Sequence, residues 1–127
     1  MKTEKNNKRA TGTLGEEIAL DFLMKNKYRI LEKNFRYKRL GEIDIISREN
    51  DYICFIEVKT RSTVEYGYPR EAVSIRKQEN IRRLAQIYIN KHNLHDENIR
   101  FDIVEVYIEK KGDEIKVREV TVIKNAF

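Results

Sequence analysis

The sequence predicts an α/β domain in which helices pack against a mixed β-sheet. Two stretches show apolar residues at helical spacing, and five shorter stretches are rich in β-branched and aromatic residues. Their order along the 127 residues is α-β-β-β-α-β-β. A chain of this length fits one domain. We expect residues 1–12, which are polar and basic, to form a flexible arm, and residues 13–127 to form the single domain.

The first helix is expected roughly from Leu14 to Asn26, where apolar residues recur with helical periodicity. Glu16 falls among these apolar positions, on the inward face, and a carboxylate there needs a partner. Thr13 and Glu16 also match a capping box, in which Thr13 would begin the helix and Glu16 would close the first turn. Capping does not exclude a second role, because a glutamate at a helix start can also lean into a neighbouring site.

The next stretch, from Tyr28 to Tyr37, alternates as a strand. The run from Lys25 to Arg39 holds seven Lys or Arg against one Glu, with aromatic residues interleaved. A strand with these residues is suited to binding the phosphate backbone of a nucleic acid. The alternative is a solvated edge strand that charge protects from aggregation.

The centre of the sheet is expected to be a hairpin from Gly41 to Arg61. If Asn50 and Asp51 form its turn, Asp44 faces Glu57 across the two strands. Two carboxylates this close repel each other unless a cation lies between them. That cation is either Lys59, two residues beyond Glu57, or a bound divalent metal. A longer turn would shift the register by one residue and break the pairing.

After an ordered loop over residues 62–69, a second helix is expected from about Ile75 to His92, with Ser74 as its N-cap. The apolar stripe, extended backwards, reaches Lys77 and Gln78, which therefore face the sheet. An inward Lys-Gln pair at a helix start suits phosphate or carboxylate contact. The alternative is ordinary polarity at a helix end.

Two closing strands are expected at 99–109 and 114–123, joined by a turn. In both strands the apolar positions change phase midway. A matching phase change predicts either a β-bulge or strands that are buried on both faces.

Composition narrows the functional classes. Lys and Arg exceed Asp and Glu by five, which fits a polyanionic partner. A single cysteine, Cys54, cannot form an internal disulfide. No signal peptide and no run of about 18 apolar residues is visible. We therefore expect a cytoplasmic protein with no membrane association. There is no glycine-rich phosphate loop, and no Ser, Cys or Thr accompanies an inward base.

The acids Asp44, Glu57 and Glu16 come from separate elements and are predicted to converge. Oxygen ligands without Cys or inward His favour Mg²⁺ or Mn²⁺ over zinc. A metal of this kind polarises a phosphodiester and ionises a bound water. Lys59 would then position that water or stabilise charge on the phosphate.

The Asp44, Glu57 and Lys59 pattern resembles the signature of the PD-(D/E)XK nuclease superfamily. Over about 11–106 the chain more specifically resembles the YraN-like family, small bacterial proteins with an endonuclease-like fold similar to archaeal Holliday-junction resolvases. The motifs that carry this resemblance are Gly15-Glu16, Gly41-Glu42-Ile43-Asp44, Phe55-Ile56-Glu57-Val58-Lys59-Thr60-Arg61, Glu71-Ala72-Val73 with Lys77-Gln78, and Arg100-Phe101-Asp102-Ile103.

The resemblance implies a restriction-endonuclease-like fold and a set of site residues. Asp44, Glu57 and Glu16 would hold the metal, with the Val58 carbonyl completing the site. Lys59 would be the catalytic lysine, with Gln78 or Lys77 as an auxiliary polar group. The candidate nucleic-acid contacts are Arg36, Lys38, Arg39, Arg61 and Lys77.

Three functions remain open at this point. The first is an Mg²⁺- or Mn²⁺-dependent nuclease acting on DNA, including branched or structured DNA. The second is a nucleic-acid-binding module that keeps the fold without turnover. The third is a structural ion cluster in an interaction protein. Resolvase-like enzymes cut as dimers, so the resemblance also makes a homodimer an expectation. The sequence itself shows no dimer surface.

Overall fold

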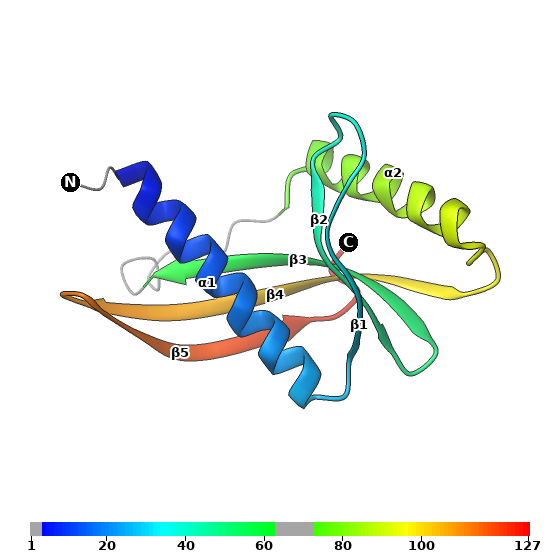
Figure 1. Cartoon of the computed structure of the whole chain (residues 1–127). Coiled ribbons are helices and arrows are strands. Elements are labelled where there is room, and N and C mark those ends of the chain that lie inside the picture. The colour runs from blue at the N-terminus through cyan, green and yellow to red at the C-terminus, as the bar shows by residue number, and fades with distance from the viewer. Residues whose placement is uncertain (1–3, 63–72) are drawn as a thin grey trace.

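The computed structural model describes residues 4–62 and 73–127 of the chain. The order of its elements confirms the predicted α-β-β-β-α-β-β arrangement (Figure 1). The elements are α1 (Glu4–Lys25), β1 (Arg29–Arg36), β2 (Glu42–Glu49), β3 (Tyr52–Ser62), α2 (Ile75–His92), β4 (Asn98–Lys111) and β5 (Glu114–Ile123).

The five strands form one sheet in the order β1-β2-β3-β4-β5. All neighbours are antiparallel except β3 and β4, which are parallel. A parallel pair needs a crossover connection, and α2 lies between these two strands in the sequence. The mixed sheet is therefore as expected, and β3, from the predicted hairpin, is its middle strand.

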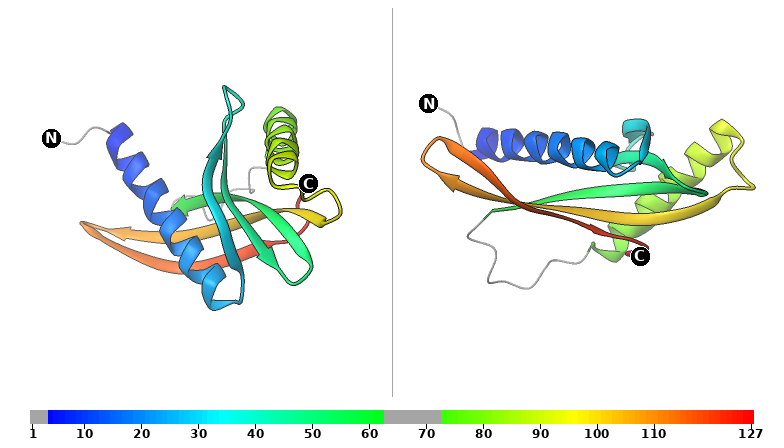
Figure 2. Two further views of the ribbon diagram at one scale, coloured as in Figure 1. Left: turned by 45° about the vertical axis from the view of Figure 1, so that its right-hand side comes forward. Right: turned by 90° about the horizontal axis from the view of Figure 1, so that it is seen from below.

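The two helices cover opposite faces of the sheet (Figure 2). On one face, Ala19 and Leu23 of α1 pack with Ile56 and Val104. On the other face, α2 covers a larger cluster. The members of this second cluster include Phe55, Ile81, Leu84, Tyr88 and Phe101. Burial on both faces explains why β3 and β4 read as nearly continuous apolar runs.

The turn between β2 and β3 has the length that the hairpin prediction assumed. Glu49 pairs with Tyr52 and Ile45 pairs with Ile56, which is the predicted register. Asn50 adopts a left-handed conformation with φ of 53°, which asparagine tolerates better than most residues.

The phase change predicted for the closing strands is also present, in both of its suggested forms. The register between β4 and β5 shifts between Tyr107 and Ile108. In β4, Phe101 and Ile103 pack in the α2 cluster, whereas Val104 and Val106 pack in the α1 cluster. The strand is thus buried on both faces, and a bulge lies toward its end.

The start of α1 differs from the prediction. The helix begins at Glu4, about ten residues before Leu14, so residues 4–12 of the expected flexible arm are helical. This segment is rich in Lys, Glu, Arg and Ala, which favour helix even where no apolar stripe marks it. Thr13 lies inside the helix and cannot be its N-cap, so the capping-box interpretation of Glu16 is wrong.

Some predicted features fall outside the described residues. These are residues 1–3 of the arm, all of the loop over 62–69 except Ser62, and Glu71-Ala72 of the family motif. Neither described helix combines the length and the apolar character that are needed to cross a bilayer.

One close approach holds α1 against the sheet. A Cβ atom added at Gly15 would lie 1.8 Å from Oγ1 and 3.1 Å from Cβ of Thr60 in β3. Threonine is β-branched and cannot easily swing away. Only glycine therefore lets the helix lie this close to the strand.

Gly15→Ala is expected to lower the melting temperature, because the helix must move off β3, although alanine favours helix. The matched control is Gly12→Ala in the same helix, where an added Cβ meets nothing within 4 Å. The control should gain about 0.5–1 kcal/mol from helix propensity. Thermal unfolding followed by circular dichroism measures both, and equal shifts in one direction would contradict the close approach.

Candidate functional site

Strands β2 and β3 separate at Asp44. Their last paired residues are Ile45 and Ile56. Ile43 packs in the α2 cluster and Ile45 in the α1 cluster, so β2 rotates between these two positions. At the separation, Asp44 Oδ2 accepts a hydrogen bond of 2.7 Å from the Val58 backbone N–H. A side-chain acceptor thus takes the place of a backbone carbonyl in the sheet.

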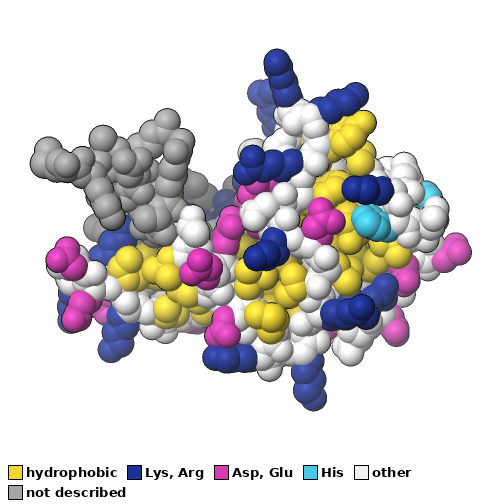
Figure 3. Space-filling view, viewed as in Figure 1, with side chains coloured by type: hydrophobic (Ala, Val, Ile, Leu, Met, Phe, Trp, Pro, Cys, Tyr) yellow, Lys and Arg dark blue, Asp and Glu magenta, His cyan; other side chains and the backbone are white. Residues whose placement is uncertain are grey.

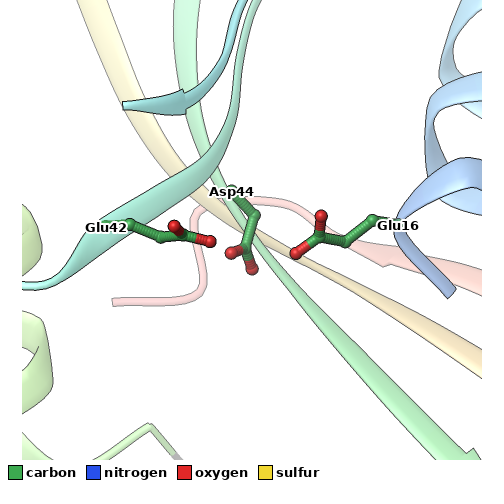
Figure 4. Close-up of side chains that lie close together, drawn as sticks. All are labelled: Glu16, Glu42 and Asp44. Atoms are coloured by element: carbon green, nitrogen blue, oxygen red, sulfur yellow. The ribbon is translucent and has the colours of Figure 1, made fainter. Parts of the chain in front are cut away.

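Three carboxylates converge at this point. One oxygen from each of Glu16, Glu42 and Asp44 lies within 4.8 Å of the others. Figure 4 shows the three side chains pointing toward one another, Glu16 from α1 and the other two from β2. Asp44 is buried, and Glu16 and Glu42 are partly buried. This spacing suits a shared cation bound by oxygen ligands.

The environment of Asp44 opposes its negative charge. Burial, followed by the carboxylate of Glu57, raises the pKa of Asp44 from an ordinary 3.8 to about 8. Glu16 and Glu42 raise it further, while the Val58 hydrogen bond acts in the opposite direction. A strongly raised pKa in a carboxylate cluster is typical of functional sites.

Side chains of β1 contact the outer two acids. Asn34 Nδ2 lies 3.3 Å from Glu16 Oε2 and 3.1 Å from Glu42 Oε1. The guanidinium of Arg36 binds Glu42 Oε2 at 2.6 Å. The bulk of the Arg36 side chain is exposed, so solvent screens this pair. These contacts orient Glu16 and Glu42 but do not reach Asp44.

Glu57 is not part of this three-acid group, although its charge acts on Asp44 more strongly than the charges of Glu16 and Glu42. Its Oε1 is 2.5 Å from Nζ of Lys77, at the start of α2. Its Oε2 is buried and has no hydrogen-bond partner among the described residues. Although burial lowers the pKa of Lys77, the hydrogen bond to Glu57 and the neighbouring acids raise it overall. Glu57 is therefore paired with Lys77, a cation from α2 that the hairpin prediction did not name.

The predicted site residues are thus only partly brought together. Asp44 and Glu16 meet as expected, and Glu57 remains close enough to perturb Asp44. Lys59 follows Glu57 on the same face of β3. The Val58 backbone N–H is bound to Asp44, and the side-chain amide of Gln78 donates to the Val73 carbonyl at 2.9 Å.

Glu42 is the site residue that sequence reasoning missed. A signal for it was present, because strand alternation places Glu42 on the same face as Asp44, two residues away. The predicted hairpin register, continued past Asp44, would place Glu42 opposite Lys59, whereas β2 and β3 are no longer paired at that point.

The candidate nucleic-acid contacts have different surroundings. Lys38 and Arg39 are exposed in the connection between β1 and β2, and Lys38 lies over the Tyr37 ring at 5.3 Å. Arg61 is largely buried, and its Nε lies 3.8 Å from Glu105 of the neighbouring strand β4. Arg61 therefore neutralises a buried acid within the sheet.

A pocket of about 410 Å³ opens beside Asp44. Glu42 and Asp44 line one side, and Arg76 and Lys77 of α2 line another. Acids and cations thus face a common space, which suits a ligand that carries phosphate together with a metal ion. The other residues that line the pocket are Leu40, Gly41, Ser74, Asn80 and Ile81.

Fold and site together define an α/β domain with a carboxylate cluster where the middle strands of a mixed sheet separate. Residues 15–106 match the family described as "Uncharacterised protein family UPF0102", and the chain belongs to that family. This confirms the YraN-like resemblance.

Relatives match over almost the whole chain. A UPF0102 protein of Acetivibrio thermocellus is 70% identical over 97% of this chain and 95% of its own length. A UPF0102 protein of Caldicellulosiruptor saccharolyticus is 46% identical over 95% of this chain and 99% of its own length. One of Clostridioides difficile is 47% identical over 83% of this chain and 91% of its own length.

Asp44→Asn is expected to stabilise the metal-free protein at alkaline pH. Between about pH 4 and pH 8 the folded protein holds a proton on Asp44 that the unfolded chain has lost, so stability falls as pH rises through this window. Asparagine keeps an acceptor for Val58 and removes the charge. We expect a gain of about 1 kcal/mol, roughly 3–5 °C, at about pH 8.5 and little change at about pH 5.

Thermal unfolding in EDTA at the two pH values measures this difference. Glu79→Gln, an exposed acid of α2, is the control and should show no such pH-dependent gain. An equal offset for Asp44→Asn at both pH values would contradict the burial of its charge.

Proposed function

We propose that the protein is a metal-dependent nuclease that hydrolyses phosphodiester bonds of DNA, including branched or structured DNA. The observation that carries this proposal is the convergence of Glu16, Glu42 and Asp44 beside a pocket lined by Arg76 and Lys77. Acids that repel one another in a largely buried place destabilise the fold, and cation binding would offset that cost.

The acids fit a hard divalent cation. All three offer oxygen, and among the described residues no His or Cys joins the cluster, which favours Mg²⁺ or Mn²⁺ over zinc. Such an ion, when bound, polarises a phosphodiester and lowers the pKa of a bound water. Glu16, Glu42 and Asp44 would hold it. The buried Oε2 of Glu57 is a further oxygen that the family resemblance assigns to the same site.

The chain's own cations have the complementary role. Arg76 and Lys77 border the pocket, so they would bind the non-bridging oxygens of the phosphate and hold it against Asp44. Lys59 lies on the same face of β3 as Glu57, and the resemblance makes it the catalytic lysine. There it would stabilise charge on the phosphate or orient the attacking water.

One observation favours the second candidate, a nucleic-acid-binding module without turnover. Glu57, which the nuclease signature requires as a ligand, is ion-paired with Lys77 and does not belong to the group formed by Glu16, Glu42 and Asp44. If this ion pair persists when nucleic acid binds, the acids never assemble and the domain only binds.

The first test is cleavage of labelled single-stranded, duplex and four-way-junction DNA with Mg²⁺ or Mn²⁺, and with EDTA. We expect metal-dependent cleavage that falls roughly 100-fold or more in Asp44→Asn and in Lys59→Met. Glu114→Gln, an exposed acid of β5, is the control and should cleave normally. Binding without cleavage at any metal concentration would favour the module, and neither binding nor cleavage at low salt would overturn both.

The second test concerns Glu42. This residue belongs to the observed carboxylate cluster but not to the pattern of Asp44, Glu57 and Lys59. Glu42→Gln is expected to weaken Mn²⁺ binding about tenfold, because one of the three converging carboxylates loses its charge. Isothermal titration calorimetry with Mn²⁺ measures this without any nuclease substrate. Glu79→Gln serves as the control, and unchanged affinity in Glu42→Gln would remove Glu42 from the site.

A further inference from the structure

We propose that a hollow between the β1–β2 connection and α2 binds an unpaired nucleobase, next to the phosphate pocket at Asp44. This proposal rests on the proposed function, because that function identifies the ligand as a strand of nucleic acid. The proposal adds the class of substrate that the same site takes. Nucleic acid with an unpaired base near the bound phosphate would be preferred over regular duplex.

The hollow has the shape and lining of a base site. It measures about 510 Å³, and its walls are almost entirely apolar. Tyr37 and Leu40 come from the β1–β2 connection, and Ile87 comes from α2. Tyr37 is a large aromatic side chain that is 43% exposed. An accessible aromatic ring beside aliphatic side chains is a stacking platform for a base.

The charge around the hollow is that of a polyanion site. Lys38, Arg39 and Arg83 line it, and none of the described acids does. Figure 3 shows Lys and Arg side chains gathered on the upper projection, with hydrophobic surface directly beneath them. Cations on the rim and an apolar interior match a nucleotide, whose phosphate is charged and whose base is flat and weakly polar.

The hollow adjoins the pocket at Asp44. Leu40 lines both the hollow and the pocket that holds Asp44. A third depression, of about 430 Å³, shares Lys38 and Arg39 with the hollow and shares Glu42 with the Asp44 pocket. A strand whose phosphate lies beside Asp44 can therefore place a neighbouring base against Tyr37 and Ile87.

Other occupants fit less well. An apolar peptide would bury Lys38, Arg39 and Arg83 against uncharged groups, which is costly. A base within a regular duplex is already stacked and paired, so it cannot enter. The combination of apolar walls, a basic rim and the adjoining phosphate pocket favours an unpaired nucleotide.

The test is binding of a fluorescein-labelled single strand of about 12 nucleotides, measured by fluorescence anisotropy in EDTA, so that no cleavage occurs. A matched strand replaces its central nucleotides with abasic residues and keeps every phosphate. We expect the wild-type protein to bind the intact strand about tenfold more tightly than the abasic strand. Tyr37→Ala and Ile87→Ser should each remove most of this preference.

Two variants serve as controls. Tyr52→Ala alters a ring about as exposed as that of Tyr37, at 41%, and Ile99→Ser alters an exposed isoleucine, at 39%. Neither residue lines the hollow. Both should keep the full preference for the intact strand. Circular dichroism of each variant confirms that it is folded.

The outcomes separate this proposal from the nuclease proposal. Equal affinity for intact and abasic strands would overturn the base site, even if metal-dependent cleavage occurs. A base preference that Tyr37→Ala removes would support the site, even if no variant cleaves. Sedimentation of the wild-type protein as a dimer that Ile87→Ser dissociates would overturn it in favour of a second copy.

Discussion

The hydrogen bond from the Val58 N–H to the Asp44 carboxylate is the interaction on which the site depends. A backbone donor in the middle of a sheet normally pairs with the next strand, and leaving it unpaired is costly. Because Asp44 supplies the acceptor, β2 can rotate away from β3 without that penalty. The rotation opens the sheet and brings Glu42 and Asp44 toward Glu16 of α1.

The protein contains a second group of buried charges, and the contrast between the two is informative. Asp102 is fully buried but accepts hydrogen bonds from Arg100 at 2.9 Å and from the Asn125 backbone at 2.9 Å. Arg100 also binds Glu49, and Lys124 binds Glu49 as a second cation. That group is balanced in charge, as buried charges in a stable core are. At Asp44 three acids meet, and burial together with the neighbouring carboxylates raises the pKa of Asp44, although Asn34, Arg36 and the Val58 N–H donate hydrogen bonds to the group. This excess of acids supports a functional interpretation.

Some basic residues neutralise buried acids, and others are exposed beside the candidate site. Arg61 and Arg100 neutralise buried acids of the sheet and hold β3 and β4 in place. Lys38 and Arg39 are exposed on the β1–β2 connection, beside the pocket in which Asp44 lies. The net positive charge of the chain is therefore a weak guide to function by itself. The location of the exposed cations around one group of cavities is the better indication.

The sequence by itself determined the element order and the two-residue hairpin turn, because periodicity and turn chemistry are local properties. Tertiary structure decided the rest. Helix α1 extends back to Glu4 through residues without an apolar stripe, which periodicity cannot detect. The rotation of β2 at Asp44 brings in Glu42, and the approach of α2 gives Glu57 to Lys77. Both depend on how helices and strands pack across the sheet, and no local pattern encodes those distances.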